Sequence, residues 1–300
     1  MAHNIPVIAV TGKTLAESYE KALIALSTDG TRFKTQYDKP GDPESIDSTM
    51  DITILEPWED PMIHKAFPGG IEDLREYVME LSGAKDHWVK NINDPKDTRW
   101  EYTYHGRLAA YGAWHELAGT ASKEMGYFKI DQIESVVAKL VKQPFTRQAQ
   151  MITWMPNLDN ECYDPPCLQS LWYRIVEDEG AWWLNCNIRF RSNDAWGASF
   201  MNMFGFIQFN RNLIADEIQK RSGKNVHLGR LNWHADSYHI YGKDIEAAKK
   251  MLFDRIGKSP FEDRIYNFHD PDIRAMYDEA EAPVITKIKE HDSTRGTKEG

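Results

Sequence analysis

Two stretches, Asp164-Pro-Pro-Cys167 and Leu184-Asn-Cys-Asn-Ile-Arg-Phe-Arg-Ser-Asn-Asp194, decide the fold that we expect for this chain. The two prolines leave the backbone before Cys167 little freedom, because proline fixes its own φ and restricts the residue before it. The second stretch alternates between apolar and polar residues, which is typical of a half-buried strand, and it delivers Arg191 and Ser192 at its end. A guanidinium and a hydroxyl at a strand end suit a phosphate. Together with the thiol, they indicate chemistry on a phosphorylated small molecule.

The order and spacing of these residues resemble the thymidylate synthase superfamily, which includes the pyrimidine nucleotide hydroxymethylases. Taken singly, a cysteine after prolines is more often a small buried residue than a nucleophile, so the features gain weight only in combination. The matching positions are Thr146-Arg147-Gln148, Pro166-Cys167, Arg191-Ser192-Asn193-Asp194, Asn202 and His239-Ile240-Tyr241. The resemblance covers roughly residues 130 to 245, whereas residues 1–100 and 251–300 fit the family pattern poorly.

The resemblance implies an α/β (α+β) fold of the thymidylate synthase type, with a mixed sheet packed by helices and a homodimer formed through the sheet face. We expect a single domain over residues 1–300, ending in a mobile polar tail over residues 287–300. The hydrophobic periodicity predicts strands over 5–10, 49–55 and 226–241, helices over 14–27, 71–81, 131–143 and 200–218, and a loop over 30–48.

Composition limits the possible partners and location. A net charge of −10 argues against a general nucleic-acid binder. Three cysteines, an odd number, argue against a disulfide framework and favour a reducing compartment. The N-terminus lacks the basic and apolar regions of a signal peptide, and the sequence has no run of 18 apolar residues. We therefore expect a cytoplasmic protein that binds neither nucleic acid nor a membrane.

The resemblance also implies roles for individual side chains. The catalytic candidates are Cys167, Glu76, Tyr104 and Asp194. Glu76 would order water and relay protons near the pyrimidine, Tyr104 would be an active-site tyrosine, and Asp194 would contact both the base and the folate. Trp100 would cover the reactive intermediate, with Trp88 as an alternative.

The substrate-binding candidates are Arg147, Gln148, Arg191, Ser192, Asn202, Arg32, and the pair His239 and Tyr241, which would hold the sugar hydroxyl. In the family, two arginines reach across the dimer interface to the partner's phosphate. Here Arg147 retains the first, and Gln148 replaces the second with an uncharged donor. Arg32 lies in an N-terminal loop where Lys34 and Lys39 are alternatives for a phosphate contact.

These residues permit a specific reaction. Addition of the Cys167 thiolate at C6 of a pyrimidine would activate C5, and Arg191 could lower the pKa of the thiol. The resemblance identifies the one-carbon donor as 5,10-methylenetetrahydrofolate and implies no metal. Hydride from the folate then gives a 5-methyl product, and water gives a 5-hydroxymethyl product. We favour dUMP to dTMP, with hydroxymethylation of dUMP, dCMP or CMP as the alternative.

Asn202 decides the choice of base in this interpretation, because a carboxamide can accept from uracil N3–H and donate to O4. Cytosine is better matched by a protonated carboxyl group. A zinc deaminase also uses Pro-Cys, but Ser170 stands where it needs a second cysteine, and the sequence has no His-x-Glu. An inactive nucleotide-binding protein stays open, because Leu168 and Gln148 depart from the family pattern.

Overall fold

The computed structural model describes residues 4–90, 94, 96–112 and 130–295 of the chain. Its main sheet is mixed and has eight strands within these ranges. They are β1 (Val7–Gly12), β2 (Thr31–Phe33), β3 (Ser45–Ile54), β5 (Ala149–Ile152), β6 (Leu168–Asp178), β7 (Ala181–Phe190), β8 (Asn193–Asp194) and β9 (Val226–Ile240). A separate two-stranded sheet pairs β4 (Ile63–His64) with β10 (Ile265–Tyr266).

The helices are α1 (Leu15–Asp29), α2 (Ile71–Leu81), α3 (Tyr104–Ala109), α6 (Gln132–Lys142), α7 (Pro156–Asp159), α8 (Ser199–Phe209), α9 (Asp216–Ser222), α10 (Ile245–Ala248), α11 (Pro271–Glu279) and α12 (Glu281–Arg295). Short 3₁₀ segments are η1 (Asp86–Trp88), η3 (Gly242–Asp244) and η5 (Phe261–Arg264), and π-helical segments are η2 (Asn210–Ala215) and η4 (Lys249–Phe253). In the part of the chain that is described, no helix has the length and apolarity needed to span a bilayer.

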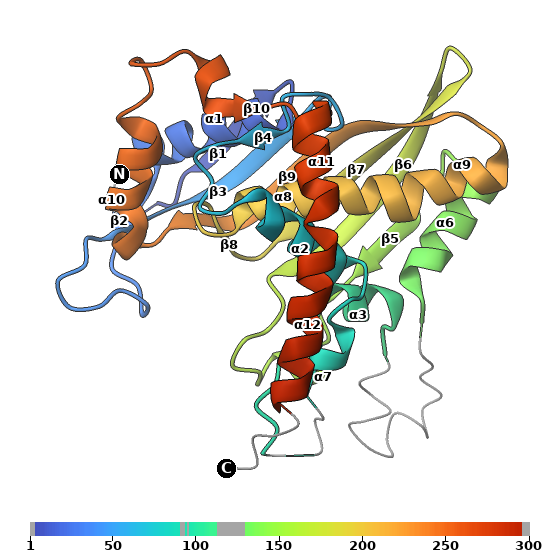
Figure 1. Cartoon of the computed structure of the whole chain (residues 1–300), viewed down its shortest axis with the longest axis horizontal. Coiled ribbons are helices and arrows are strands. Elements are labelled where there is room, and N and C mark those ends of the chain that lie inside the picture. The colour runs from blue at the N-terminus through green and yellow to red at the C-terminus, as the bar shows by residue number, and fades with distance from the viewer. Residues whose placement is uncertain (1–3, 91–93, 95, 113–129, 296–300) are drawn as a thin grey trace.

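Strand β9 lies at the centre of the sheet, between β3 and β7 (Figure 1). The strand order is β1-β3-β9-β7-β6-β5, with β2 paired to β3 and β8 paired to β9. Strand β9 runs parallel to β7 and antiparallel to β3. Its C-terminal end therefore places His239 opposite both Asp47 on β3 and Asp194 on β8.

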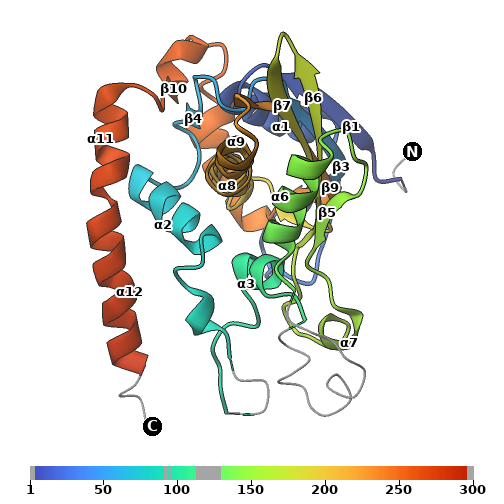
Figure 2. The ribbon, with the colours of Figure 1, turned by 90° about the vertical axis from the view of Figure 1, so that its right-hand side faces the viewer.

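Helix α8 fills the core beside this sheet. Its buried apolar side chains are Phe200, Met203, Phe204, Phe206, Ile207 and Phe209. A helix that is apolar on nearly all sides is stable only between layers, and burial of each large side chain contributes roughly 1.5–3 kcal/mol. Figure 2 shows this arrangement edge-on, with α8 beside the sheet, α2 beyond α8, and α11 and α12 outermost.

Several sequence predictions agree closely with these elements. The predicted helix over 71–81 coincides with α2, and the predicted strand over 226–241 contains β9. The predicted helix over 200–218 is interrupted, because α8 passes into η2 before α9 continues to Ser222. The mixed sheet packed by helices confirms the predicted fold class.

The structure differs from the sequence prediction in two polar segments. The loop expected over 30–48 contains β2 and the start of β3, because β2 pairs with Ser45–Asp47. The tail expected over 287–300 is helical as far as Arg295. Val284 and Ile288, one turn apart, pack on Trp88, and this short apolar pair was hidden by the polar composition around it.

A buried carboxylate ties α1 to the two-stranded sheet. Glu20 accepts hydrogen bonds from His64 Nε2 at 2.8 Å and from Arg264 Nε and Nη2 at 2.8 and 2.7 Å. Burial by itself would raise the pKa of Glu20, but the hydrogen bonds from His64 and Arg264 outweigh it and lower the pKa to about 2. Because the pKa is lowered by folding, this carboxylate stabilises the fold above its ordinary pKa and loses that contribution as the pH falls toward 2.

We predict that Glu20→Gln lowers the free energy of unfolding at pH 7 by about 2–3 kcal/mol. The wild type should lose this difference between about pH 4.5 and pH 2, where the variant should be less sensitive to acid. Urea unfolding at several pH values measures both effects. The control is Glu17→Gln on the same helix, whose pair with Lys21 is partly exposed and should contribute under about 1 kcal/mol. Equal losses for the two variants would contradict the prediction.

Candidate active site

Cys167 immediately precedes β6 and lies against the end of β7, where the two motifs of the sequence meet. The backbone N–H of Arg191 donates to the Cys167 carbonyl at 2.8 Å. The Arg191 guanidinium donates to the carbonyls of Pro166 and Pro165 at 3.1 and 2.6 Å. Arg191 therefore fixes the proline-rich turn that carries the thiol.

Burial raises the pKa of the half-buried Cys167 thiol. The nearby Arg191 charge lowers the pKa, as expected from the sequence, and Asp164 raises it further. Because burial is the largest of the three effects, Arg191 only partly offsets the cost of forming the thiolate in the ligand-free protein.

Among the described residues, the tyrosines that interact electrostatically with Cys167 are Tyr77, Tyr102, Tyr104 and Tyr241. Burial raises the pKa of all four phenols, to about 12 for Tyr241, so each stays protonated at neutral pH and can donate. The predicted Tyr104 is at the site, and its hydroxyl accepts from the Leu168 N–H at 3.4 Å. Sequence reasoning missed Tyr77 and Tyr102, although alternation with Tyr104 was a usable signal for Tyr102.

Asn202 is oriented by a directional chain of hydrogen bonds. The indole N–H of Trp233 can only donate, and it donates to Asn193 Oδ1 at 3.1 Å. Asn193 Nδ2 then donates to Asn202 Oδ1 at 3.0 Å, and Asn202 Nδ2 donates to Tyr77 Oη at 2.6 Å. Helix α2 can bring Tyr77 this close because α8 has Gly205 at the crossing, where an added Cβ would lie 2.5 Å from the Tyr77 ring.

The residues predicted to bind the sugar and the phosphate lie in two different places. Ser192, His239 and Tyr241 line one cavity of about 380 Å³, and Asp194 lies beside them, with Oδ1 accepting from the N–H groups of Trp196 and Gly197. The other residues around the cavity are Phe33, Lys34, Thr35, Gln36, Tyr37, Asp47 and Ser237. Arg32 is exposed on β2 and is not part of the lining, whereas its alternative Lys34 is.

Arg147 and Gln148 are exposed and lie between α6 and β5. Both residues make hydrogen bonds through their backbone carbonyls: Arg147 O accepts from Trp172 Nε1, and Gln148 O accepts from Lys139 Nζ, both at 3.0 Å. Neither residue lines the 380 Å³ cavity of the sugar candidates.

Trp100 and not Trp88 faces open space. A cavity of about 250 Å³ is lined by Glu80, Trp100, Glu101, Tyr102, Thr103, Tyr104 and Asp164. It shares Trp100, Glu101 and Asp164 with a wider groove of about 790 Å³ whose lining includes Tyr37 and Arg99. Trp88 is buried and contacts Trp100 edge-on, with ring centroids 5.1 Å apart.

Glu76 is paired on both sides, with Lys85 at 2.7 Å and Lys287 at 2.6 Å. Burial would raise the pKa of Glu76, but the hydrogen bonds from Lys287 and Lys85 outweigh it and lower the pKa. Glu80, one turn later, has its pKa raised by burial and lines the cavity of Tyr104. The i, i+4 row of acids contained both residues. Glu80 lines the cavity of Tyr104, and Glu76 lines a neighbouring cavity together with Tyr77 and Glu80.

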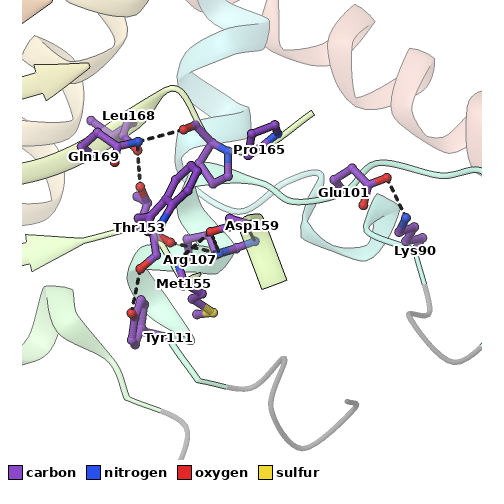
Figure 3. A network of polar contacts seen from close by, with 12 residues as sticks. Lys90, Glu101, Arg107, Tyr111, Thr153, Met155, Asp159, Pro165, Leu168 and Gln169 are labelled. Atoms are coloured by element: carbon purple, nitrogen blue, oxygen red, sulfur yellow. Dashed lines mark hydrogen bonds and ion pairs between the residues drawn. The ribbon is translucent and has the colours of Figure 1, made fainter. Parts of the chain in front are cut away.

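A buried ion pair supports the segment that leads to Cys167 (Figure 3). Arg107 donates to both carboxylate oxygens of Asp159, at 2.9 and 2.7 Å, and to the Thr153 carbonyl at 3.0 Å. The Thr153 hydroxyl donates in turn to the Leu168 carbonyl. Leu168, the residue after Cys167, is therefore connected through Thr153 to the ion pair between α3 and α7. Among the described residues, no group of three or more His, Cys, Asp or Glu side chains could hold a metal ion.

Comparison with known proteins gives a consistent result. A family model described as thymidylate synthase matches residues 75–274. A protein of Methanosarcina barkeri named "Putative thymidylate synthase" is 25% identical over 245 residues, covering 81% of this chain and 94% of that protein. One of the same name from Methanocaldococcus jannaschii is 27% identical over 252 residues, covering 82% and 96%.

Among solved structures, the thermostable thymidylate synthase A of Bacillus subtilis has a similar fold. The TM-score is 0.56 at 17% identity, over 80% of this chain and 84% of that one. At this identity, the structural likeness concerns the fold alone. The family model, which covers most of the chain and includes Cys167 and Arg191, decides the family. The chain belongs to the thymidylate synthase family.

Proposed function

We propose that this protein transfers a one-carbon unit from 5,10-methylenetetrahydrofolate to C5 of a pyrimidine nucleotide, converting dUMP to dTMP. The observation that carries the proposal is that the Cys167 thiol lies near both Arg191 and a group of protonated tyrosines, with Asn202 hydrogen-bonded to one of them, Tyr77. A nucleophile, a cation and an oriented amide are what C6 addition to uracil requires.

In this mechanism, the Cys167 sulfur adds to C6 and negative charge spreads over the ring from C5 to O4. Asn202 uses one donor and one acceptor within the protein, which leaves its second N–H for O4 and its second lone pair for N3–H. Tyr104, which stays protonated, would relay protons through water together with Glu76, as the sequence predicted, or with Glu80, whose pKa is raised by burial. C5 would then bond to the one-carbon unit supplied by the folate. Loss of the C5 proton and of the folate amine would leave an exocyclic methylene, and hydride from the folate, or water, would add to that carbon as the sulfur leaves C6.

The groove beside Trp100 fits the folate. Its indole and the neighbouring tyrosines offer stacking surfaces, Arg99 lies in the wider part, and about 790 Å³ is within the range of small-molecule sites. The folate would supply the one-carbon unit and, for a methyl product, the hydride. Hydroxymethylation of dUMP or dCMP is the second candidate, and the width of this groove favours it, because the outcome depends on how completely Trp100 excludes water.

The product assay tests the function directly. The protein is incubated with methylenetetrahydrofolate and either dUMP or dCMP, and the nucleotide product is identified by mass. We expect 5-methyl product and dihydrofolate from dUMP, whereas a hydroxymethyl product without dihydrofolate would establish the second candidate. Cys167→Ala should abolish turnover, and Cys162→Ala, which removes another half-buried thiol of the same segment, should retain it. Appreciable turnover by Cys167→Ala would contradict the mechanism.

Base choice is predicted to depend on residue 202. Asn202→Asp should lower kcat/KM for dUMP by about tenfold or more and raise it for dCMP, because a protonated carboxyl group can donate to cytosine N3. Competition between the two nucleotides in one reaction gives the ratio directly. An unchanged ratio in a variant with normal thermal unfolding would show that Asn202 does not read the base.

We also propose a homodimer in which Arg147 and Gln148 bind the partner's nucleotide phosphate. The exposed apolar residues Val7, Val176 and Trp183 on three sheet strands support this interface.

Arg147→Ala and Cys167→Ala should each be inactive alone. Mixed dimers should recover roughly a quarter of wild-type activity, since half of the dimers are mixed and each has one intact site. No recovery from mixed dimers confirmed by sedimentation would place Arg147 in its own chain's site.

A further inference from the structure

Two buried polar atoms at one cavity have no hydrogen-bond partner among the described residues. They are Asp47 Oδ1 and His239 Nε2, and their residues are only 8% and 7% exposed. Both residues line the cavity of about 380 Å³ that also contains Ser192 and Tyr241. An unpaired buried polar atom destabilises a folded protein, so such atoms at a cavity indicate a ligand that supplies the missing partners.

Asp47 and His239 are joined through a serine. The Ser237 hydroxyl donates to Asp47 Oδ2 at 2.6 Å and lies 3.3 Å from His239 Nδ1. Asp47 Oδ2 and His239 Nδ1 therefore have partners within the protein, whereas Asp47 Oδ1 and His239 Nε2 are left for a ligand in the cavity. Tyr241 packs edge-on against His239, with ring centroids 4.6 Å apart, and limits the movement of the imidazole.

The chemistry of a carboxylate restricts the ligand. An ionised aspartate only accepts hydrogen bonds, so the ligand must present an O–H or N–H group. A phosphate is excluded at this point, because it would bring a second negative charge next to Asp47. In the proposed function, the N–H of the base is read by Asn202. The donors left on a pyrimidine nucleotide are its sugar hydroxyls.

We propose that Asp47 is a specificity-determining residue that accepts a hydrogen bond from a sugar hydroxyl of the nucleotide, beside His239. The inference rests on the proposed function only in taking the ligand to be a pyrimidine nucleotide. The ammonium group of Lys34, which also lines the cavity, donates to the backbone carbonyls of Asp42 and Pro43 and leaves Asp47 Oδ1 without a hydrogen bond.

The same two strands contain a matched control. Asp51 of β3 lies opposite His234 of β9, as Asp47 lies opposite His239. In that pair, Asp51 Oδ1 is 2.9 Å from His234 Nδ1, and neither residue lines the 380 Å³ cavity. Asp51→Asn therefore removes a carboxylate from the same strand pair without removing a free acceptor from the cavity.

The test measures nucleotide binding by calorimetry, without folate or turnover, for wild type, Asp47→Asn and Asp51→Asn. The ligands are dUMP, UMP, 3′-deoxy-UMP and 2′,3′-dideoxy-UMP. Asp47→Asn should weaken binding of nucleotides that have the recognised hydroxyl by about tenfold to a hundredfold, and binding of the dideoxy nucleotide by less than about threefold. The 2′- and 3′-deoxy ligands show which hydroxyl is read. Asp51→Asn should bind all four like the wild type.

An equal loss for the dideoxy nucleotide would overturn the inference and leave the proposed function standing. So would unchanged binding of all four ligands by Asp47→Asn. Failure of the wild type to bind any of them would overturn the proposed function as well. If Asp47→Asn does not fold, Ser237→Ala serves as the second variant, because it removes the hydroxyl that donates to Asp47 and positions it. Ser237→Ala should weaken binding of the nucleotides that have the recognised hydroxyl several-fold and leave binding of the dideoxy nucleotide unchanged.

Discussion

The indole N–H of Trp233 determines how the amide side chains of the candidate active site are oriented. It can donate but not accept, so every amide that follows it has its orientation determined in turn. Asn193 must present its oxygen to the indole, Asn202 must present its oxygen to Asn193, and Tyr77 accepts from one N–H of Asn202. Trp233 is fully buried at the centre of the sheet, so this starting point cannot rotate. The amide that would read a base is thus oriented by a core residue.

Strand β9 connects this hydrogen-bonded chain with the cavity that contains His239. One strand supplies Trp233 to the amide chain and His239 to the cavity, and it pairs with β3, β7 and β8. Because side chains alternate along a strand, a slip of one residue would move both groups to the wrong face. The irregularity opposite Ser48 and Met50 lies between these two parts of β9, where it can adjust their relative direction.

The sequence was sufficient for the parts of the site that follow one another along the chain. Periodicity predicted α2 and β9, and the spacing from Cys167 to Arg191 indicated a family that the comparisons confirm. It was insufficient where the site depends on packing between distant elements. Tyr77 reaches Asn202 only because Gly205 lets two helices approach, and Asp47 joins the cavity only through the register of β3 with β9. Neither contact leaves a local pattern in the sequence.

Leu168 departs from the family pattern, and the structure explains this difference in a way that bears on activity. Its side chain is fully buried, and its backbone groups contact Tyr104 and Thr153, so Leu168 is a core residue that fixes the end of the segment carrying Cys167. The polar surroundings of the thiol come instead from tyrosines, whose hydroxyls stay protonated because burial raises their pKa values. An apolar residue at 168 therefore leaves the neighbourhood of Cys167 with hydrogen-bond donors. It gives no ground for regarding the protein as an inactive relative.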